Sequence, residues 1–273
     1  MADGYRAGTG LEHPALLYAS RQDFLETMVP FVADGIDDHE FVFVAARADN
    51  LAALVTELGE RAASALWADT EQWHPHPATR LRAFHELVTD QLDAGATRLR
   101  LVGEPVWPSG PPELVREWQR YESVLNSVLA PFPVSLMCLY DTARLDPDVV
   151  EVARRTHPVV RRSGTQRPSG RFEDPERFLS RWNPEPLSPP RSAACLALVT
   201  DLLTARRFLS QQAIRAGLRP ARVGDLCTAA NEVLTESLVH KAAAALWTWS
   251  EAGHFVCHIE ARGHDLVNLF SGY

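Results

Sequence analysis

The stretch "RLRLVGEPVWP", residues 98–108, decides the fold of the first half of the chain. It opens with a short β-prone run and then enters a proline-containing loop, so a strand ends there. Two similar runs, "FVFVAA" (41–46) and "VSLMCLY" (134–140), and weaker ones at 15–19 and 64–68 predict further strands. Stretches with helical periodicity separate these runs, which is typical of an α/β fold with a mainly parallel sheet and flanking helices. The predicted helices cover residues 21–35, 48–61, 77–94, 111–130 and 146–155.

The composition changes after residue 160. Residues 161–192 are rich in Pro, Arg, Ser and Gly and predict a linker between a first domain at 11–160 and a second at 193–273. The apolar side chains of Phe172, Phe178, Leu179 and Trp182 are unfavourable in water, which favours a linker that straps across one of the domains. The residue pattern of the second domain predicts helices over 193–216 and 220–241 and strands over 245–249 and 255–261. These elements would form a small α+β domain.

Composition limits the classes of partner. The 273 residues carry a formal net charge of −8, so a broad cationic surface for nucleic acid or an anionic membrane is not expected. The sequence begins without a signal-peptide pattern and contains no apolar run long enough to span a bilayer, which predicts a soluble cytoplasmic protein. The cysteines are widely spaced among apolar neighbours and predict buried thiols rather than ligands or disulfides: Cys138, Cys195, Cys227 and Cys257.

Common catalytic motifs are absent. The chain has no glycine-rich phosphate loop, no G-x-S-x-G and no H-E-x-x-H, which weakens the nucleotide-hydrolase, esterase and metallopeptidase interpretations. "WHPHP" (73–77) brings His74 and His76 close in sequence, with His85 downstream, but no carboxylate or cysteine joins them. We therefore predict no metal site.

Strand ends carry the candidate ligand-binding residues. In an open parallel sheet ligands bind at the carboxyl ends of strands, and the loop after "RLRLV" supplies Glu104 and Trp107 there. "CLYD" (138–141) supplies Tyr140 and Asp141 in the same way, and a helix at 117–126 carries Trp118, Tyr121 and Glu122. The alternative is that the aromatic residues belong to the core and the carboxylates cap helices; the sequence leaves both interpretations open.

Several spaced motifs in the first domain resemble one known family. "EHPALLYASRQDFLETMVPFVADGI", "EFVFVAA", "RLRLVGEPVWP", "WQRYESVLN" and "CLYD…THP" occur in the order found in the MEDS domain, a sensory module of bacterial regulators. The resemblance spans about residues 11–160. It implies a RecA/KaiC-like sheet without a phosphate loop, and sensing of a small molecule rather than catalysis. His13 and Tyr18 match the N-terminal H…Y pattern of the family and are candidate sensing residues.

The second domain resembles the opening of an anti-sigma-factor type of histidine-kinase-like (GHKL) ATPase domain, which actinobacterial regulators combine with a MEDS domain. The similarity lies in "LVTDLLTARRFLSQQAIRAGLRPARVGDLCTAANEVLTESLVHK". The family motif E-x-x-x-N would place Glu232 at the position of the catalytic base, but Glu236 stands where an asparagine holds Mg²⁺. Asn231 points elsewhere around the helix and does not replace it. A second carboxylate facing a polyphosphate adds repulsion.

The next family motif, D-x-G-x-G, is also altered. Ala261 stands at the aspartate position that contacts adenine, Gly263 matches one glycine and Asp265 replaces the other. "VNLFSGY" resembles the following stretch, and the later glycine-rich lid, helix and strand are missing from the 273 residues. These alterations predict a degenerate, incomplete domain, whose candidate cofactor-binding residues are Asn231, Glu236 and Gly263. We expect no cofactor, with ATP and Mg²⁺ only if the degenerate site still works.

Our interpretation is a bacterial signalling regulator in which a MEDS-like sensory domain controls an anti-sigma-type protein-binding module without catalysis. The expected partner is a sigma factor or an anti-anti-sigma (STAS) protein, with a small-molecule signal and a possible homodimer. Two alternatives stay open. One is an ATP-dependent serine kinase that acts on an anti-anti-sigma partner with Glu232 as base, and the other is a small-molecule sensor with a docking or dimerising remnant.

Overall fold

The computed structural model describes residues 10–74, 76–107, 112–181, 188–239 and 243–262. The chain divides into two compact units, the first ending at residue 182 and the second beginning at residue 183. Each unit has its own sheet, with seven strands in the first and three in the second.

The first unit is built on a mainly parallel sheet in the order β3-β2-β4-β5-β1-β6-β7. Strands β1 to β6 run parallel, and β7 pairs antiparallel with β6 at the edge. The central strands β1 and β4 are buried along their whole length, as expected for an apolar strand covered on both faces. The strands are β1 (Pro14–Tyr18), β2 (Phe41–Ala46), β3 (Leu66–Asp69), β4 (Leu99–Gly103), β5 (Val134–Asp141), β6 (Val159–Arg162) and β7 (Thr165–Pro168).

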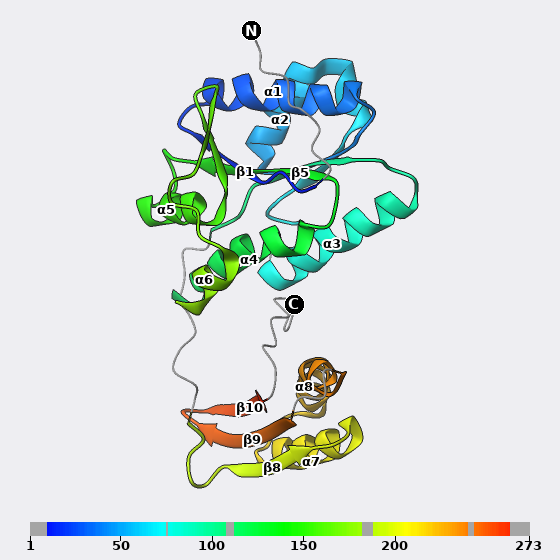
Figure 1. The fold of residues 1–273 in the computed structure, drawn as a ribbon, viewed down its shortest axis with the longest axis vertical. Helices are drawn as coiled ribbons and strands as arrows, with labels where there is room; N and C mark the ends of the chain where they lie inside the picture. Colours follow the sequence, from blue (N-terminus) through cyan, green and yellow to red (C-terminus); the bar gives the residue numbers. More distant parts are fainter. Residues whose placement is uncertain (1–9, 75, 108–111, 182–187, 240–242, 263–273) are drawn as a thin grey trace. The chain divides into compact units, whose positions relative to one another are not determined.

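Helices cover both faces of this sheet. Helices α1 and α2 lie on one face, and α3, α4 and α5 lie on the other (Figure 1). Side-chain oxygens of Ser20 and Asp146 accept backbone N–H groups at the starts of α1 and α5, which explains where these helices begin. The helices are α1 (Arg21–Asp37), α2 (Ala48–Leu58), α3 (Pro77–Asp93), α4 (Pro112–Leu129), α5 (Pro147–Thr156) and α6 (Pro175–Ser180), with a 3₁₀ turn at Gly59–Ser64.

The segment predicted as a linker contains regular structure. Strands β6 and β7 form a hairpin whose turn has positive φ at Ser163 and Gly164, a conformation that glycine adopts without strain. Helix α6 follows, and its Phe178 is fully buried against α4 and α5, with the Arg155 guanidinium 4.9 Å from the ring centroid. The strap expected from the apolar residues is therefore present on the first unit. Trp182 lies outside the described residues.

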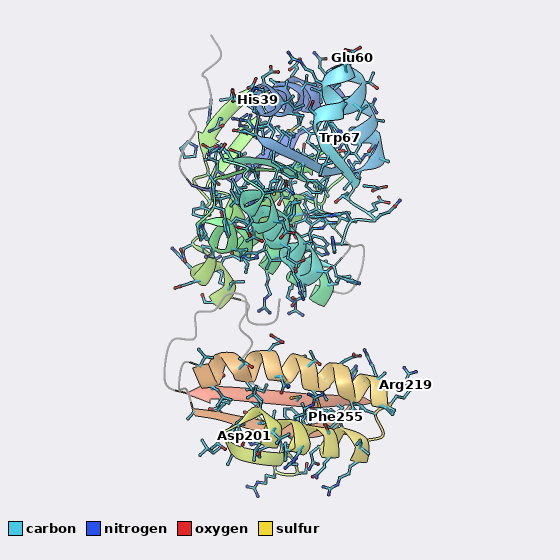
Figure 2. The ribbon with its side chains drawn as sticks, turned by 90° about the vertical axis from the view of Figure 1, so that its right-hand side faces the viewer. His39, Glu60, Trp67, Asp201, Arg219 and Phe255 are labelled. Atoms are coloured by element: carbon cyan, nitrogen blue, oxygen red, sulfur yellow. The ribbon has the colours of Figure 1, made fainter. Side chains whose placement is uncertain are left out.

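The second unit is an antiparallel sheet in the order β10-β9-β8 with two helices packed on it. Asp201 caps α7 by accepting the Thr204 N–H at 2.7 Å, and Arg219 immediately precedes α8 (Figure 2). The core is shared between the helices and the sheet, with Leu209, Leu234 and Leu246 among its buried members. The elements are β8 (Ala194–Val199), α7 (Leu202–Arg215), α8 (Pro220–Val239), β9 (Ala243–Glu251) and β10 (His254–Arg262).

Two expectations are wrong here. The helix predicted over 193–216 begins only at Leu202, because "ACLALV" (194–199) forms a strand that pairs with β9. Alanine and leucine favour helices locally, and the tertiary pairing overrides that preference. Cys138 and Cys227 are buried as predicted, but Cys195 on this strand is exposed and Cys257 is partly exposed. No helix in the described part of the chain is long and apolar enough to cross a bilayer.

Candidate functional site

Polar side chains meet at the carboxyl ends of four neighbouring strands in the first unit. Tyr18 ends β1, Asp141 ends β5, and Glu104 and Arg47 follow β4 and β2, with Asn50 in the first turn of α2. Because these strands are parallel, their carboxyl ends lie along the same edge of the sheet. We call these five residues the strand-end cluster.

Glu104 is the centre of the strand-end cluster. Its side chain is 6% exposed, and the Arg47 guanidinium Nε lies 2.8 Å from its Oε1. The carboxylate also accepts the Arg47 backbone N–H at 2.9 Å and the Asn50 amide at 2.9 Å, and the Tyr18 hydroxyl donates to it at 3.3 Å. A buried carboxylate with this set of donors has its charge and hydrogen bonds satisfied. Burial, and then the Glu104 charge, raise the pKa of Tyr18, so the phenol stays protonated.

The solvent side of this cluster is formed by a looser ion pair. The Arg47 side chain is 23% exposed, and its Nη2 donates to the Tyr18 hydroxyl at 3.3 Å and to Asp141 at 3.5 Å, a carboxylate that is 13% exposed. Asp141 is also paired with Arg144 at 3.4 Å. The Asp141 contact is longer and more exposed than the Glu104 contact. An anionic or hydrogen-bond-accepting small molecule would therefore compete with Asp141 for Arg47 more readily than with Glu104.

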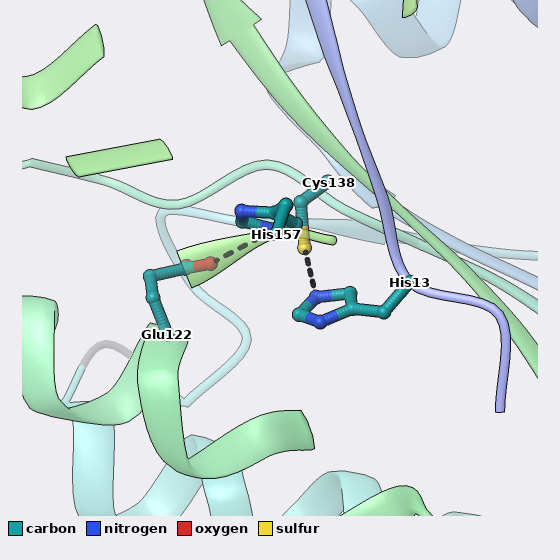
Figure 3. A group of neighbouring side chains, drawn as sticks. All are labelled: His13, Glu122, Cys138 and His157. Atoms are coloured by element: carbon teal, nitrogen blue, oxygen red, sulfur yellow. Dashed lines mark hydrogen bonds and ion pairs between the residues drawn. The ribbon is translucent and has the colours of Figure 1, made fainter. Parts of the chain in front are cut away.

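A second group lies beneath the sheet, between its strands and the helices α4 and α5. His13 comes just before β1, Glu122 lies on α4, Cys138 lies on β5 and His157 follows α5 (Figure 3). Their side chains point toward one another, and their ligand-type atoms all lie within 4.8 Å of one another. All four are buried, with relative exposures of 2, 1, 2 and 0%. We call them the buried cluster.

Sheet register explains why two of these residues meet. Ala15 of β1 pairs directly with Cys138 of β5. His13 precedes Ala15 by two residues, so side-chain alternation places it on the face of the sheet that Cys138 occupies. Glu122 reaches the same face from α4, and its Oε2 accepts the Tyr140 hydroxyl at 2.9 Å.

Hydrogen bonds fix the orientation of both imidazoles. Nδ1 of His13 lies 3.0 Å from Oδ1 of Asn126, whose amide nitrogen donates to the Thr156 carbonyl at 2.7 Å. Nδ1 of His157 lies 2.8 Å from the carbonyl oxygen of Ala153 and 3.0 Å from the Thr156 hydroxyl, which itself donates to the Val152 carbonyl. Because each partner of Nδ1 is an acceptor, each Nδ1 carries the proton. The Nε2 atoms of both rings are then unprotonated and face the cluster.

Burial disfavours the charged forms of the side chains in the buried cluster. It lowers the pKa of His13 to about 4 and the pKa of His157 well below its ordinary value, so both imidazoles are neutral at pH 7. It raises the pKa of Glu122 to about 7, against the opposing hydrogen bond from Tyr140, and raises the pKa of the Cys138 thiol. The His157 Nε2 atom is buried without a hydrogen-bond partner, 3.6 Å from Glu122 Oε2.

The structure divides the predicted sensing residues between two places. Tyr18, Glu104 and Asp141 meet in the strand-end cluster. His13 belongs to the buried cluster, and Tyr140 contacts it through Glu122. The Trp107 ring lies beside that of Tyr140, with centroids 6.5 Å apart. Sequence reasoning missed three participants because their partners are distant in sequence: Arg47, Asn50 and His157, the last of which stands in the "THP" part of a recognised motif.

The candidate residues of the second unit lie on or after α8. Asn231 is partly buried and Glu232 is exposed. The side chain of Glu236, and Gly263 altogether, lie outside the described residues. His74, His76 and His85 belong to no group of three or more close His, Cys, Asp or Glu ligand atoms within the described ranges.

A separate open groove of about 450 Å³ lies beside the β6–β7 hairpin. Its lining includes four arginines, of which Arg154 and Arg171 are paired with Glu151. The excess of positive charge suits an anionic molecule. The arginines are Arg154, Arg162, Arg167 and Arg171.

The first unit is similar to a known protein family. A family model described as MEDS, the methanogen/methylotroph DcmR sensory domain, matches residues 12–158. The matched range contains both the strand-end cluster and the buried cluster. No curated protein matches the chain.

Proposed function

The chain belongs to the MEDS family through its first unit, and from this premise we propose that it is a bacterial signalling regulator in which a sensed small molecule controls protein binding by the second unit. The family match is the observation that carries the sensory role. The signal would act by shifting the population of conformations toward the one that binds it more tightly.

We place signal binding at the strand-end cluster. Strand ends are the usual ligand position in a parallel α/β sheet, and here Arg47 pairs both with the buried Glu104 and with Asp141, which is 13% exposed. A polar signal would replace Asp141 as the outer partner of Arg47 while Glu104 keeps the guanidinium in place. Tyr18 and Asn50 hold Glu104 and so position the site.

For the second unit we propose an incomplete anti-sigma-type, histidine-kinase-like domain that binds a sigma factor or an anti-anti-sigma (STAS) protein. The support is the sequence resemblance along α7 and α8 and the order of two helices followed by the β9–β10 hairpin. Glu232 stands at the position of the catalytic base, but Glu236 replaces the asparagine that holds Mg²⁺ in the related domains. This replacement favours protein binding without catalysis. ATP and Mg²⁺ are therefore not expected as cofactors.

The sensory role is tested by a ligand screen on the full chain. Thermal shift is recorded with a collection of small polar compounds, and every compound that stabilises the protein is retested on Asp141→Asn and on the control variant Asp37→Asn. Asp37 belongs to an exposed ion pair with Arg61, away from the strand ends. We expect at least one compound whose apparent affinity changes about tenfold or more in Asp141→Asn and is unchanged in the control. Compounds that respond equally to both substitutions would place the sensing site elsewhere.

The output role is tested by calorimetric titration of the full chain with purified sigma factors and STAS proteins from the genome that encodes it. We expect one of them to bind, with an affinity that the compound identified above changes. If none binds, the second unit is not a sigma-pathway module, and the interpretation as a plain small-molecule sensor is favoured.

A further inference from the structure

We propose that His13, Glu122, Cys138 and His157 bind one divalent transition-metal ion of the zinc type. This inference goes beyond the proposed function and does not depend on it, because it concerns a different group of residues. It rests on the distances, the hydrogen bonds and the donor chemistry of the buried cluster.

The distances suit a tetrahedral ion. Bonds of about 2.0–2.3 Å to a tetrahedral centre place the ligand atoms about 3.3–3.8 Å from one another. Nε2 of His13 lies 3.3 Å from Sγ of Cys138, and Nε2 of His157 lies 3.6 Å from Oε2 of Glu122. Two opposite edges of a tetrahedron therefore already have the required length (Figure 3). The remaining pairs of ligand atoms are within 4.8 Å, so small side-chain rotations bring all four atoms to bonding distance of one ion.

The hydrogen bonds around the imidazoles are those of metal-binding histidines. A histidine that binds a metal through Nε2 generally donates its Nδ1 proton to a carbonyl or carboxylate, which fixes the ring and its tautomer. His13 donates to the side-chain carbonyl of Asn126, and His157 donates to the backbone carbonyl of Ala153. Both lone pairs are thereby directed at the place where the ion would lie.

One of these lone pairs is otherwise unexplained. The Nε2 atom of His157 is fully buried and has no hydrogen-bond partner. Burying a polar atom without a partner is unfavourable, and most such atoms in folded proteins are paired. An ion bound to this nitrogen supplies the missing partner of the lone pair. It also gives the Glu122 carboxylate, 3.6 Å away, a positive partner.

The donor set selects the class of ion. Two imidazoles, a thiolate and a carboxylate suit zinc and similar transition metals, whereas Mg²⁺ and Ca²⁺ prefer oxygen ligands. Binding displaces the Cys138 thiol proton, and any proton held by Glu122, to solvent as the metal–sulfur and metal–oxygen bonds form. The thiolate and carboxylate together neutralise a divalent charge, so the loaded site places no net charge in the core.

Four protein ligands leave no open position, which is typical of a structural rather than a catalytic site. The ion would connect four segments that are far apart in sequence: the start of β1, helix α4, strand β5 and the residue after α5. It would hold α4 and α5 against the sheet.

Cobalt(II) reports such a site by spectroscopy. The full chain is unfolded in denaturant with a chelator, and the chelator is then removed. The protein is refolded with Co²⁺, because ligands that are at most 2% exposed are hard to reach in the folded state. We expect one bound ion per chain, the visible bands of tetrahedral cobalt and a thiolate-to-cobalt charge-transfer band. Refolding with an excess of Zn²⁺ over Co²⁺ should prevent these bands, because zinc competes for the same site.

The other three cysteines provide matched controls. The triple variant Cys195→Ser/Cys227→Ser/Cys257→Ser retains Cys138 as its only cysteine and should keep the full charge-transfer band. Cys138→Ser should lose that band. Asn126→Ala, which removes the acceptor for His13 Nδ1, should keep the spectrum and weaken metal affinity about 10–100-fold.

The proposal fails if refolded wild-type protein binds less than one equivalent of Co²⁺, or if the triple variant lacks the charge-transfer band. Both measurements use chains with the buried cluster intact, so a folding defect in Cys138→Ser does not affect the decision. The change of compound affinity in the Asp141→Asn screen tests the sensory proposal separately and leaves this result unchanged.

Discussion

Nε2 of His157 lies 3.6 Å from Oε2 of Glu122, and neither atom is exposed to water. An unprotonated imidazole nitrogen and a carboxylate both offer lone pairs, so they do not hydrogen-bond unless one of them takes up a proton. The pKa of His157 is lowered by burial, while the pKa of Glu122 is raised to about 7. In the absence of an ion, the proton that this pair needs is therefore more readily held by Glu122 than by His157.

Zinc should stabilise the folded protein. At a free Zn²⁺ concentration about 1,000-fold above the dissociation constant, binding to the folded state alone adds about 4 kcal/mol to the free energy of unfolding. Differential scanning calorimetry with and without a chelator measures the change. Glu122→Gln removes one charged ligand, so its melting temperature should respond much less to zinc. Equal responses of the wild type and this variant would show that zinc acts elsewhere.

Removal of the positive charge of Arg47 should destabilise the folded first unit. Arg47→Met leaves the Glu104 carboxylate, which is 6% exposed, without its positive partner. We expect a loss of about 2–4 kcal/mol in the free energy of unfolding, measured by denaturant titration. Arg61→Met is the matched control, because the Arg61–Asp37 pair is 55% exposed on both sides and should contribute less than about 1 kcal/mol. Similar losses in both variants would contradict this account of the cluster.

Two helical glycines should respond in opposite directions to alanine. A Cβ at Gly35 would lie 2.6 Å from Cδ of Arg100, whose Nε is held by Glu40 at 2.5 Å. Gly35→Ala should therefore destabilise the first unit by about 1–3 kcal/mol through overpacking.

At Gly224 in α8 the added Cβ meets nothing within 4 Å, so Gly224→Ala should stabilise the second unit by about 0.5–1 kcal/mol. Calorimetry should resolve the transitions of the two units. A stabilising Gly35→Ala would show that Arg100 can move aside without breaking its ion pair with Glu40.

The full chain should not bind Mg-ATP. Glu236 replaces the magnesium-holding asparagine of the related domains and would repel the polyphosphate, so calorimetric titration should give no saturable heat. If saturable binding is observed and Glu232→Gln weakens it, the kinase alternative is correct and the second unit retains a nucleotide site.

Much of the first unit could be predicted because its signals are local. The runs at 41–46, 98–102 and 134–140 are β-prone and end in turn-forming residues, and they correspond to β2, β4 and β5. Five predicted helices agree with α1 to α5 within a few residues, apart from the end of α2, where the chain continues as a 3₁₀ turn.

The elements that were missed depend on distant partners or on turn geometry. Strand β8 has helix-forming residues and becomes a strand through pairing with β9, which lies far along the chain. The β6–β7 hairpin has an unremarkable strand composition, and only Ser163-Gly164 signals its turn.

The buried cluster could not be predicted from the spacing of its residues in the sequence. His13, Glu122, Cys138 and His157 follow no ligand motif, and two of them meet only because β1 and β5 are neighbours in the sheet. Cys138 was predicted as a buried thiol, which is correct, but its imidazole neighbours lie more than a hundred residues before it and in the segment after α5. Tertiary structure is needed to bring such groups together.

The central claim is that these four side chains form one metal site. The most direct measurement is an anomalous difference map, collected at the zinc absorption edge from crystals of zinc-loaded full-length protein. The account predicts a single strong peak between His13, Glu122, Cys138 and His157, within bonding distance of all four ligand atoms. A map from fully loaded crystals with no peak at this position would contradict it.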